Sequence, residues 1–335
     1  MKNKIKKIKK TIGEIPATPD ERAFLPILLV TVCMTVAFIA MIIDRFIFSF
    51  GNDLLSPIIA QLVAMLIPAY LCMLLLCPEK KLSAQLKGIG MARIGHEYVF
   101  FLIFSALFVI TTALLLNIIF GGVYDSAKGF TLLGTFTAGE NEYTVNVLYL
   151  VAVYAVIPAV IDELVFRGIV YSELRGISEG LAICVSSLFS ALFAFTLGGL
   201  PSALFCALAY CFIRFTTGSL LSCIIVHFSY NLYALFLATN VSKYFISAQN
   251  TALLTVIIVG AWLISTALFV SESARVYRTK AGKIADGEQA SEVPRIKPRE
   301  LLIEAKGAFI YPPTLVCAII TLVLYAATVV IKILA

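Results

Sequence analysis

Three ionisable residues stand at the end of an apolar run in the stretch "VIDELVFRGIVYSELRG", which begins at Val160. Glu163 and Arg167 are four residues apart, so on a helix they share a face, with the acid before the base in the order that favours an ion pair. Asp162 lies about 100° round the helix from Glu163, which lets both carboxylates face one side of a bundle. Placing a charged side chain in or near the hydrocarbon core of a membrane is costly in free energy. These residues therefore form either a salt bridge at a membrane interface or a functional polar cavity, such as one that carries an ion or a proton.

A second pair of polar residues interrupts the apolar stretch "GSLLSCIIVHFSYNLYALF", which begins at Gly218. His227 lies about nine residues into this stretch, and Asn231 follows one helical turn later on the same face. The chain has one other histidine, His96, in an expected loop. One interpretation is an interhelical hydrogen-bonding pair that holds a bundle together. The other is that both polar sites converge on one cavity.

The elements that must position these groups are membrane-spanning helices. The chain has 335 residues, of which 60% are hydrophobic and 14% charged, with a mean hydropathy of +0.97. A soluble domain has about 25% charged residues. A helix needs roughly 20 apolar residues to cross the hydrocarbon core. We therefore expect an all-α polytopic transmembrane bundle of about nine spans. The segments are 25–43, 55–77, 98–120, 145–166, 179–197, 200–216, 218–239, 250–272 and 313–334.

The distribution of basic residues predicts the orientation of the bundle. The first ten residues, "MKNKIKKIKK", contain six lysines and are interpreted as a retained cytoplasmic anchor rather than a cleaved signal peptide. Nine spans threaded from this tail place 22 of the 26 Lys and Arg residues inside, as the positive-inside rule expects. We expect an integral protein of a bacterial plasma membrane with a cytoplasmic N-terminus. The net charge of +6 favours membrane lipids as partners and gives no case for nucleic acid.

Three stretches resemble, in order, the motif regions of the CAAX prenyl protease and bacteriocin-processing family of intramembrane proteases. They are "DELVFR", "SSLFSALFAF" and "YCFIRFTTGSLLSCIIVHFSYN", and the resemblance covers about residues 145–239. The family's Glu-Glu-x-x-x-Arg motif corresponds to Asp162, Glu163 and Arg167. Its His-x-x-x-Asn motif corresponds to His227 and Asn231. The resemblance implies that these carboxylates, the histidine and the asparagine are catalytic, and we assign Arg167 to a structural ion pair with Glu163.

Two positions depart from the family pattern. Asp162 stands where the family has its first Glu. In the family's Phe-x-x-x-His motif the Phe corresponds to Phe189, but the His position is Phe193. The resemblance implies that the first carboxylate activates a water, as a general base or beside a metal that the missing His would hold, and that His227 and Asn231 stabilise an oxyanion. Two carboxylates and one His are fewer ligands than a tight zinc site usually offers. The cofactor therefore stays unknown, because the family implies zinc but the ligand set is incomplete.

These considerations leave three functions open. The first is an intramembrane endopeptidase of reduced activity that cuts a peptide or a membrane-protein segment near the cytoplasmic face, with Asp162 or Glu163 as its base. The second is a pseudoprotease that binds such segments, or a partner membrane protein, without cutting. The third is a small ion-coupled transporter.

Four regions are expected along the chain. They are a basic cytoplasmic tail (1–24), N-terminal transmembrane helices (25–143), a protease-like core (144–240) and C-terminal transmembrane helices (241–335) with a cytoplasmic loop at 273–309.

Overall fold

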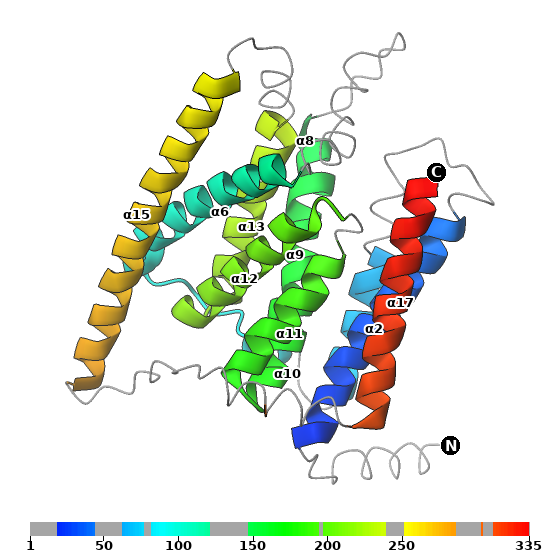
Figure 1. Ribbon diagram of the computed structural model, residues 1–335. Helices are drawn as coiled ribbons and strands as arrows, with labels where there is room; N and C mark the ends of the chain where they lie inside the picture. Colours follow the sequence, from blue (N-terminus) through cyan, green and yellow to red (C-terminus); the bar gives the residue numbers. More distant parts are fainter. Residues whose placement is uncertain are drawn as a thin grey trace, which may run out of the picture.

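The computed structural model is a bundle of helices (Figure 1). It describes residues 19–43, 62–76, 82–120, 147–193, 197–238, 251–285, 303 and 311–334, and these residues contain no β-strand. The helices before the core are α2 (Pro19–Ile43), η2 (Leu62–Leu66), α4 (Ile67–Leu76), α5 (Leu82–Gly88), η3 (His96–Tyr98) and α6 (Val99–Ile119). Those of the core are α8 (Val147–Val151), η4 (Ala152–Val156), α9 (Ile157–Glu163), η5 (Leu164–Val170), α10 (Tyr171–Arg175), α11 (Glu179–Leu192), α12 (Leu200–Thr217), α13 (Leu220–Tyr233) and η6 (Ala234–Ala238). They are followed by α15 (Thr251–Ala285) and α17 (Pro312–Leu334).

The expected all-α polytopic bundle is confirmed, with about nine spans as an approximate number. In the part of the chain that the structure describes, six stretches of helix are long and apolar enough to cross a membrane. They are Ala23–Ala40, His96–Ile119, Leu148–Arg175, Leu200–Thr217, Thr255–Lys280 and Pro312–Ile331. Three of the expected segments form shorter apolar helices, Leu62–Leu74, Glu179–Leu192 and Leu220–Phe236. At 1.5 Å per residue, Glu179–Leu192, whose two ends are both described, rises about 21 Å, which is less than the ~30 Å hydrocarbon core.

Two clusters of buried apolar side chains divide the bundle. One cluster joins α2, α4, α11 and α17 to the segment from α9 to α10. The other joins α6, α12, α13 and α15. The first motif lies on the α9 and η5 segment and the third on α13, and these two elements pack against each other. The polar residues of the motifs therefore lie at the boundary between the two clusters.

Helix α15 extends into the first part of the expected loop at 273–309. The segment 273–285 continues the helix without a break, while 286–302 and 304–310 lie outside the described residues. An ion pair between Arg275 and Glu272, at 2.7 Å, supports the added turns, and Val276 is buried against the second cluster. The sequence-based boundary marked the end of the apolar run. The helix ends later because these contacts hold its polar continuation.

A short segment after α5 crosses the end of the bundle and is held by a buried arginine. Arg214 Nη2 donates to the carbonyl of Ile89 at 3.0 Å, and Arg214 Nη1 donates to the carbonyl of Gly218. Gly90 has a φ of +88°, and a Cβ on it would overlap the Arg214 guanidinium. Gly218 ends α12 with a φ of +70°, the left-handed conformation that glycine favours at a helix C-terminus. Because these two positions are glycines, the segment after α5 and the α12–α13 turn can both contact the Arg214 guanidinium.

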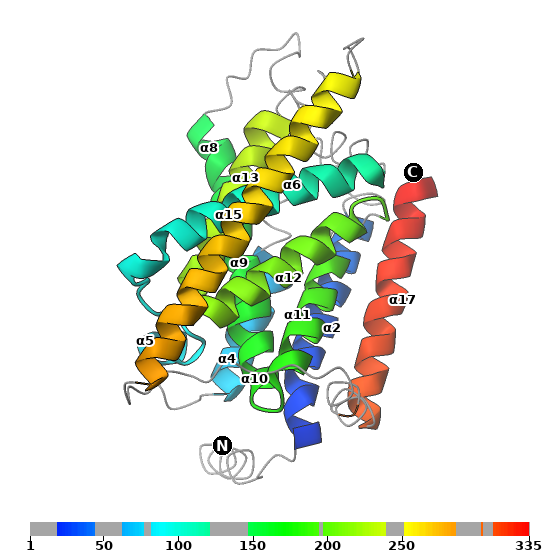
Figure 2. The same cartoon turned by 60° about the vertical axis from the view of Figure 1, so that its left-hand side comes forward.

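The long helices are arranged as expected for a bundle that crosses one membrane, because the ends predicted to be cytoplasmic all lie on one side. Figures 1 and 2 show the first turns of α2 and α17, the turn between α10 and α11, and the last turn of α15 at the same end of the bundle. These are the ends that the positive-inside rule places in the cytoplasm. Which face is cytoplasmic stays a prediction. The basic tail up to residue 18 and the polar loop 121–143 lie outside the described residues.

Candidate functional site

The first motif is built on a helix that changes its winding. Asp162 and Glu163 end α9, and Arg167 follows in η5, a π-helical segment. Glu163 has 0% of its side chain exposed and Arg167 1%, and Arg167 Nη1 lies 3.4 Å from Glu163 Oε1. The predicted ion pair is therefore present and fully buried. Pi-helical turns are rare and frequently occur at functional sites.

Arg167 also binds two other helices. Its Nη1 donates to Ser190 Oγ on α11 at 2.9 Å, and its Nη2 donates to the carbonyl of Ala207 on α12 at 2.9 Å. Arginine has five N–H donors in a planar fork, so one side chain can satisfy an acid and two neutral acceptors at once. The guanidinium thus fixes η5, α11 and α12 relative to one another.

The third motif meets the first at Glu163. His227 Nδ1 lies 2.9 Å from the same Oε1 atom that faces Arg167, and the His227 side chain is 14% exposed. The predicted convergence of the two polar sites is therefore confirmed. Because Nδ1 faces the carboxylate, Nε2 is the ring nitrogen that this contact leaves available. The other oxygen, Glu163 Oε2, is buried without a hydrogen-bond partner among the described residues.

Tyr210, the first residue of the third stretch, is a member of this site to which the motif comparison gave no role. Its ring stacks on the His227 ring with centroids 4.8 Å apart and planes 19° apart, and the Arg167 guanidinium lies 5.4 Å from the Tyr210 centroid. The sequence offered one signal, a tyrosine with a polar hydroxyl inside the span just before the third motif. That signal does not distinguish a stacking partner from an ordinary core residue.

Asn231 is turned toward the backbone of the preceding segment. Its Nδ2 donates to the carbonyl of Ala155 in η4 at 3.3 Å. The structure therefore brings Asn231 to the same pair of helices as Glu163 and His227, with one of its two N–H donors already used. This contact fits the interhelical role considered from the sequence and leaves one donor for other chemistry.

Asp162 differs from Glu163 in its surroundings. It is partly exposed, and it forms no hydrogen bond or ion pair with any residue that the structure describes. His227, Glu163 and Arg167 all lie within electrostatic range of its carboxylate. Asp162 thus has no hydrogen-bond or ion-pair partner among the described residues, whereas Glu163 has two.

Phe193 follows the last residue of α11, and its ring packs edge-on against Phe166, with centroids 5.3 Å apart. Phe166 precedes Arg167, so the second motif does reach the first. The more specific expectation, that the ring lies beside Asp162 and His227, stays a prediction.

The donors at this site do not fit the zinc that the family resemblance implies. Among the described residues, no three His, Cys, Asp or Glu side chains are arranged to hold a metal ion. Glu163 Oε1 is engaged by Arg167 and His227, and Phe193 supplies no ligand atom. We therefore derive no reaction step through a metal.

Comparisons with known proteins bear on the same segment. No curated protein and no solved structure matches the chain significantly. Residues 144–233 match a family model, described as type II CAAX prenyl endopeptidase Rce1-like. The match includes Glu163, Arg167, Tyr210, His227 and Asn231. It confirms the family resemblance of the motifs, so that across 144–233 this membrane protein is similar to the Rce1-like CAAX prenyl endopeptidases.

Proposed function

We propose that the protein is an intramembrane endopeptidase-like protein that acts on peptide or membrane-protein segments near the cytoplasmic face. The observation that carries this proposal is the 2.9 Å contact between Glu163 Oε1 and His227 Nδ1, which joins the first and third motifs inside the matched segment. In a transporter, a buried carboxylate paired with both an arginine and a histidine would have to release them for each ion or proton.

In the proposed reaction, Asp162 acts as the general base. Its free carboxylate takes a proton from a water, and the water oxygen attacks the carbonyl carbon of the scissile peptide bond. The shorter side chain of aspartate makes the position of the water critical, because a base must lie within hydrogen-bond distance of the proton it takes. The C–N bond then breaks, and the proton returns from Asp162 to the leaving amine.

His227 and Asn231 are proposed to stabilise the oxyanion. The contact of Nδ1 with the Glu163 carboxylate leaves Nε2 as the ring nitrogen directed to the oxyanion, to which it donates when it carries a proton. The stacked Tyr210 ring fixes the plane of the imidazole, so Nε2 points in one direction. Loss of one such donor usually costs about 3 to 4 kcal/mol of transition-state stabilisation.

A second candidate function, a pseudoprotease that binds segments without cutting them, rests on Phe193. The histidine that would hold the water is replaced by a phenyl ring, and this ring packs against Phe166. The binding surfaces of the motif helices do not depend on that histidine. A pseudoprotease of this kind would therefore keep the fold and bind segments, but it would not catalyse their cleavage.

The test compares cleavage and binding of one probe, a farnesylated peptide that ends in Cys-a-a-X. For the endopeptidase-like function, the purified chain cleaves the probe, Asp162→Asn lowers the rate at least about 100-fold, and Glu173→Gln, a carboxylate change outside the motifs, does not. Binding without cleavage by the native chain would identify the pseudoprotease. Absence of both would reject the two functions together.

A further inference from the structure

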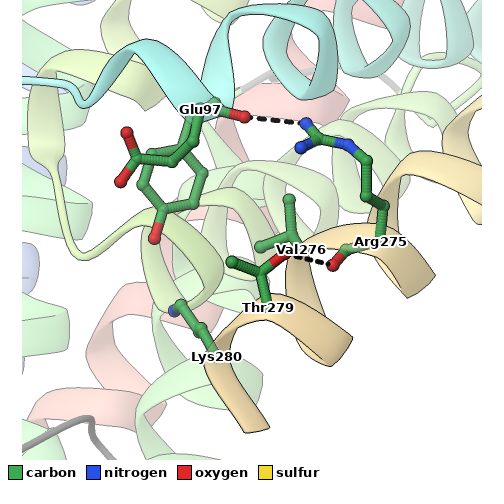
Figure 3. A pocket seen from close by; sticks show the side chains of 6 residues that line it. Glu97, Arg275, Val276, Thr279 and Lys280 are labelled. Carbon is green, nitrogen blue, oxygen red and sulfur yellow. Dashed lines mark hydrogen bonds between the residues drawn. The ribbon is translucent and has the colours of Figure 1, made fainter. Parts of the chain in front are cut away.

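A small cleft lies where two membrane-spanning helices end, away from the motif residues. We call it the headgroup cleft, and it is lined by Glu97, Tyr98, Arg275, Val276, Thr279 and Lys280 (Figure 3). The first two residues lie at the start of the span His96–Ile119, and the other four lie at the end of the span Thr255–Lys280. Since both apolar spans end at this point, the cleft lies at the edge of the hydrocarbon core, at the level of lipid headgroups.

Two cations of the headgroup cleft are held in place by neutral acceptors. Arg275 Nη2 donates to the backbone carbonyl of Glu97 at 2.8 Å, as Figure 3 shows, and Lys280 Nζ donates to the backbone carbonyl of Thr216. Lys280 also lies 6.0 Å from the centroid of the Tyr98 ring. Carbonyl oxygens and an aromatic ring fix a cation without cancelling its charge. Since a guanidinium has five N–H donors and an ammonium three, both side chains keep donors for an anion.

The acidic residues nearby do not neutralise the headgroup cleft. Glu272 accepts from Arg275 Nε at 2.7 Å on the surface of α15 and offsets one charge. The carboxylate of Glu97 lies against Gly95, and Figure 3 shows it directed away from Arg275. Lys280 therefore keeps its charge uncompensated, and Arg275 offers its remaining donors, so the cleft is suited to an anion.

The surface beside the headgroup cleft is apolar and open, which distinguishes a lipid from a free anion. Val99 is 45% and Phe100 62% exposed on α6, and Val270 is 58% exposed on α15. Only 11% of the residues in the α15 span are buried inside the protein. A soluble phosphate would gain nothing from these side chains, whereas the acyl chains of a lipid would cover them.

We infer that the headgroup cleft binds the phosphate of an anionic phospholipid from the surrounding leaflet. Arg275 and Lys280 hold the phosphate, and Val99, Phe100 and Val270 contact the acyl chains. This site does not depend on the proposed proteolytic function. It differs from the general attraction of a basic protein to acidic membranes because it depends on particular residues.

The test measures binding of short-chain phosphatidylglycerol to the full chain in neutral detergent, by native mass spectrometry. We expect Arg275→Gln and Lys280→Gln each to weaken binding about fivefold, the effect of one basic residue near an anionic headgroup. Arg278→Gln removes the same charge from an exposed position of the same helix outside the cleft, and we expect little change. Phosphatidylcholine is expected to bind more weakly than phosphatidylglycerol.

Three outcomes would overturn this site. Equal weakening by Arg278→Gln would show attraction to total charge, and equal binding of phosphatidylcholine would show that the anion is not recognised. Glycerol phosphate that binds as tightly as the lipid would show a site for soluble phosphate. Melting temperatures without lipid identify variants that do not fold. If Arg275→Gln does not fold, lipid binding is measured instead for Lys280→Gln and for Arg275→Lys, which keeps the charge.

Discussion

At the scale of the residue, one carboxylate oxygen determines what the other motif side chains can do. Glu163 Oε1 faces both Arg167 and His227 within a site that excludes water from the carboxylate. A buried ion pair is costly to break from one side, because the remaining charge is left without a partner. Glu163 therefore holds His227 and Arg167 in place, and the proposed proton transfer is assigned to Asp162. The two adjacent carboxylates differ in their surroundings, because only Glu163 is buried and paired.

The first prediction concerns Arg167. We expect Arg167→Ala to lower the free energy of unfolding by about 3 to 5 kcal/mol, because it leaves the fully buried Glu163 unpaired. It also removes the donors to Ser190 and Ala207. The measurement is the thermal unfolding of the purified protein in detergent.

The matched control for Arg167 is a second ion pair with the same spacing. Arg175 and Glu179 are also four residues apart, at 2.8 Å, but the Arg175 side chain is 48% exposed. Exposed pairs of this kind contribute about 0.3 to 0.5 kcal/mol, so Arg175→Ala should change the melting temperature little. Similar losses from the two variants would contradict a special structural role for Arg167.

The second prediction separates the ring of Tyr210 from its hydroxyl. The hydroxyl is buried without a hydrogen-bond partner among the described residues, while the ring stacks on His227. Tyr210→Phe should therefore keep or slightly raise the melting temperature, because it removes an unpaired polar group. Tyr210→Leu should lower the melting temperature because it removes the stack. A large decrease in the melting temperature of Tyr210→Phe would mean that the hydroxyl has a hydrogen-bond partner, such as a bound water.

The third prediction concerns Phe193, which departs from the family motif. We expect Phe193→His to gain affinity for zinc relative to the native chain, because it adds a nitrogen ligand near the first motif. Metal content of the purified variant measures this directly, and Phe193→Leu is the control for loss of the ring alone. Equal zinc content in the native chain and both variants would show that position 193 does not reach the site.

The sequence predicts some parts of this site and not others, for a physical reason. The Glu163–Arg167 pair follows from helical spacing, and the involvement of His227 follows from the cost of polar groups in an apolar span. Tyr210, Ser190 and the Ala207 carbonyl did not emerge in this way. Each of these three partners is far from Arg167 in the chain and reaches it only through tertiary packing. A serine or a carbonyl in a span is also common enough to carry no signal by itself.

At the scale of the element, hydropathy predicts which segments cross the membrane but not the residues at which their helices end. The span predicted to end at residue 272 continues to Ala285 as α15, since the polar turns pack on η3 and carry their own ion pair. The change from α9 to the π-helical η5 was also not predicted. One extra residue per turn alters the direction of every side chain that follows. Positions four apart therefore give only the approximate placement of Arg167.

The fourth prediction concerns the segment that Arg214 holds against the α12–α13 turn. Gly90 has a positive φ and no room for a Cβ beside the Arg214 guanidinium. We expect Gly90→Ala to cost about 1 to 3 kcal/mol of stability, from the left-handed conformation and the displaced cation. Thermal unfolding in detergent measures the loss.

Gly88 provides the control for Gly90. It lies two residues earlier, at the end of α5, where an added Cβ would meet no atom within 4 Å. Gly88→Ala should be neutral or slightly stabilising, since alanine favours helix. If both variants melt like the native protein, the segment is not held by Arg214.

At the scale of the whole molecule, the second and third motifs lie on helices shorter than the spans, whereas the first lies within the span Leu148–Arg175. Helices α11 and α13 are among the shorter apolar helices, and both pack on α12, which is long enough to span. This arrangement lets charged and polar groups from α9, η5 and α13 meet inside the bundle without facing hydrocarbon.

The last prediction concerns the orientation of the whole bundle. The 22 basic residues assigned inside and the four assigned outside predict that the segment after α15 is cytoplasmic and that the 121–143 segment is outside. In a variant without native cysteines, Ser126→Cys should react with an impermeant thiol reagent on intact cells, and Gly287→Cys should react only after the cells are opened. Both positions lie outside the described residues, so the experiment tests the charge argument independently of the helix packing. Labelling of Gly287→Cys but not Ser126→Cys in intact cells would show that the bundle has the opposite orientation, with the headgroup cleft in the outer leaflet.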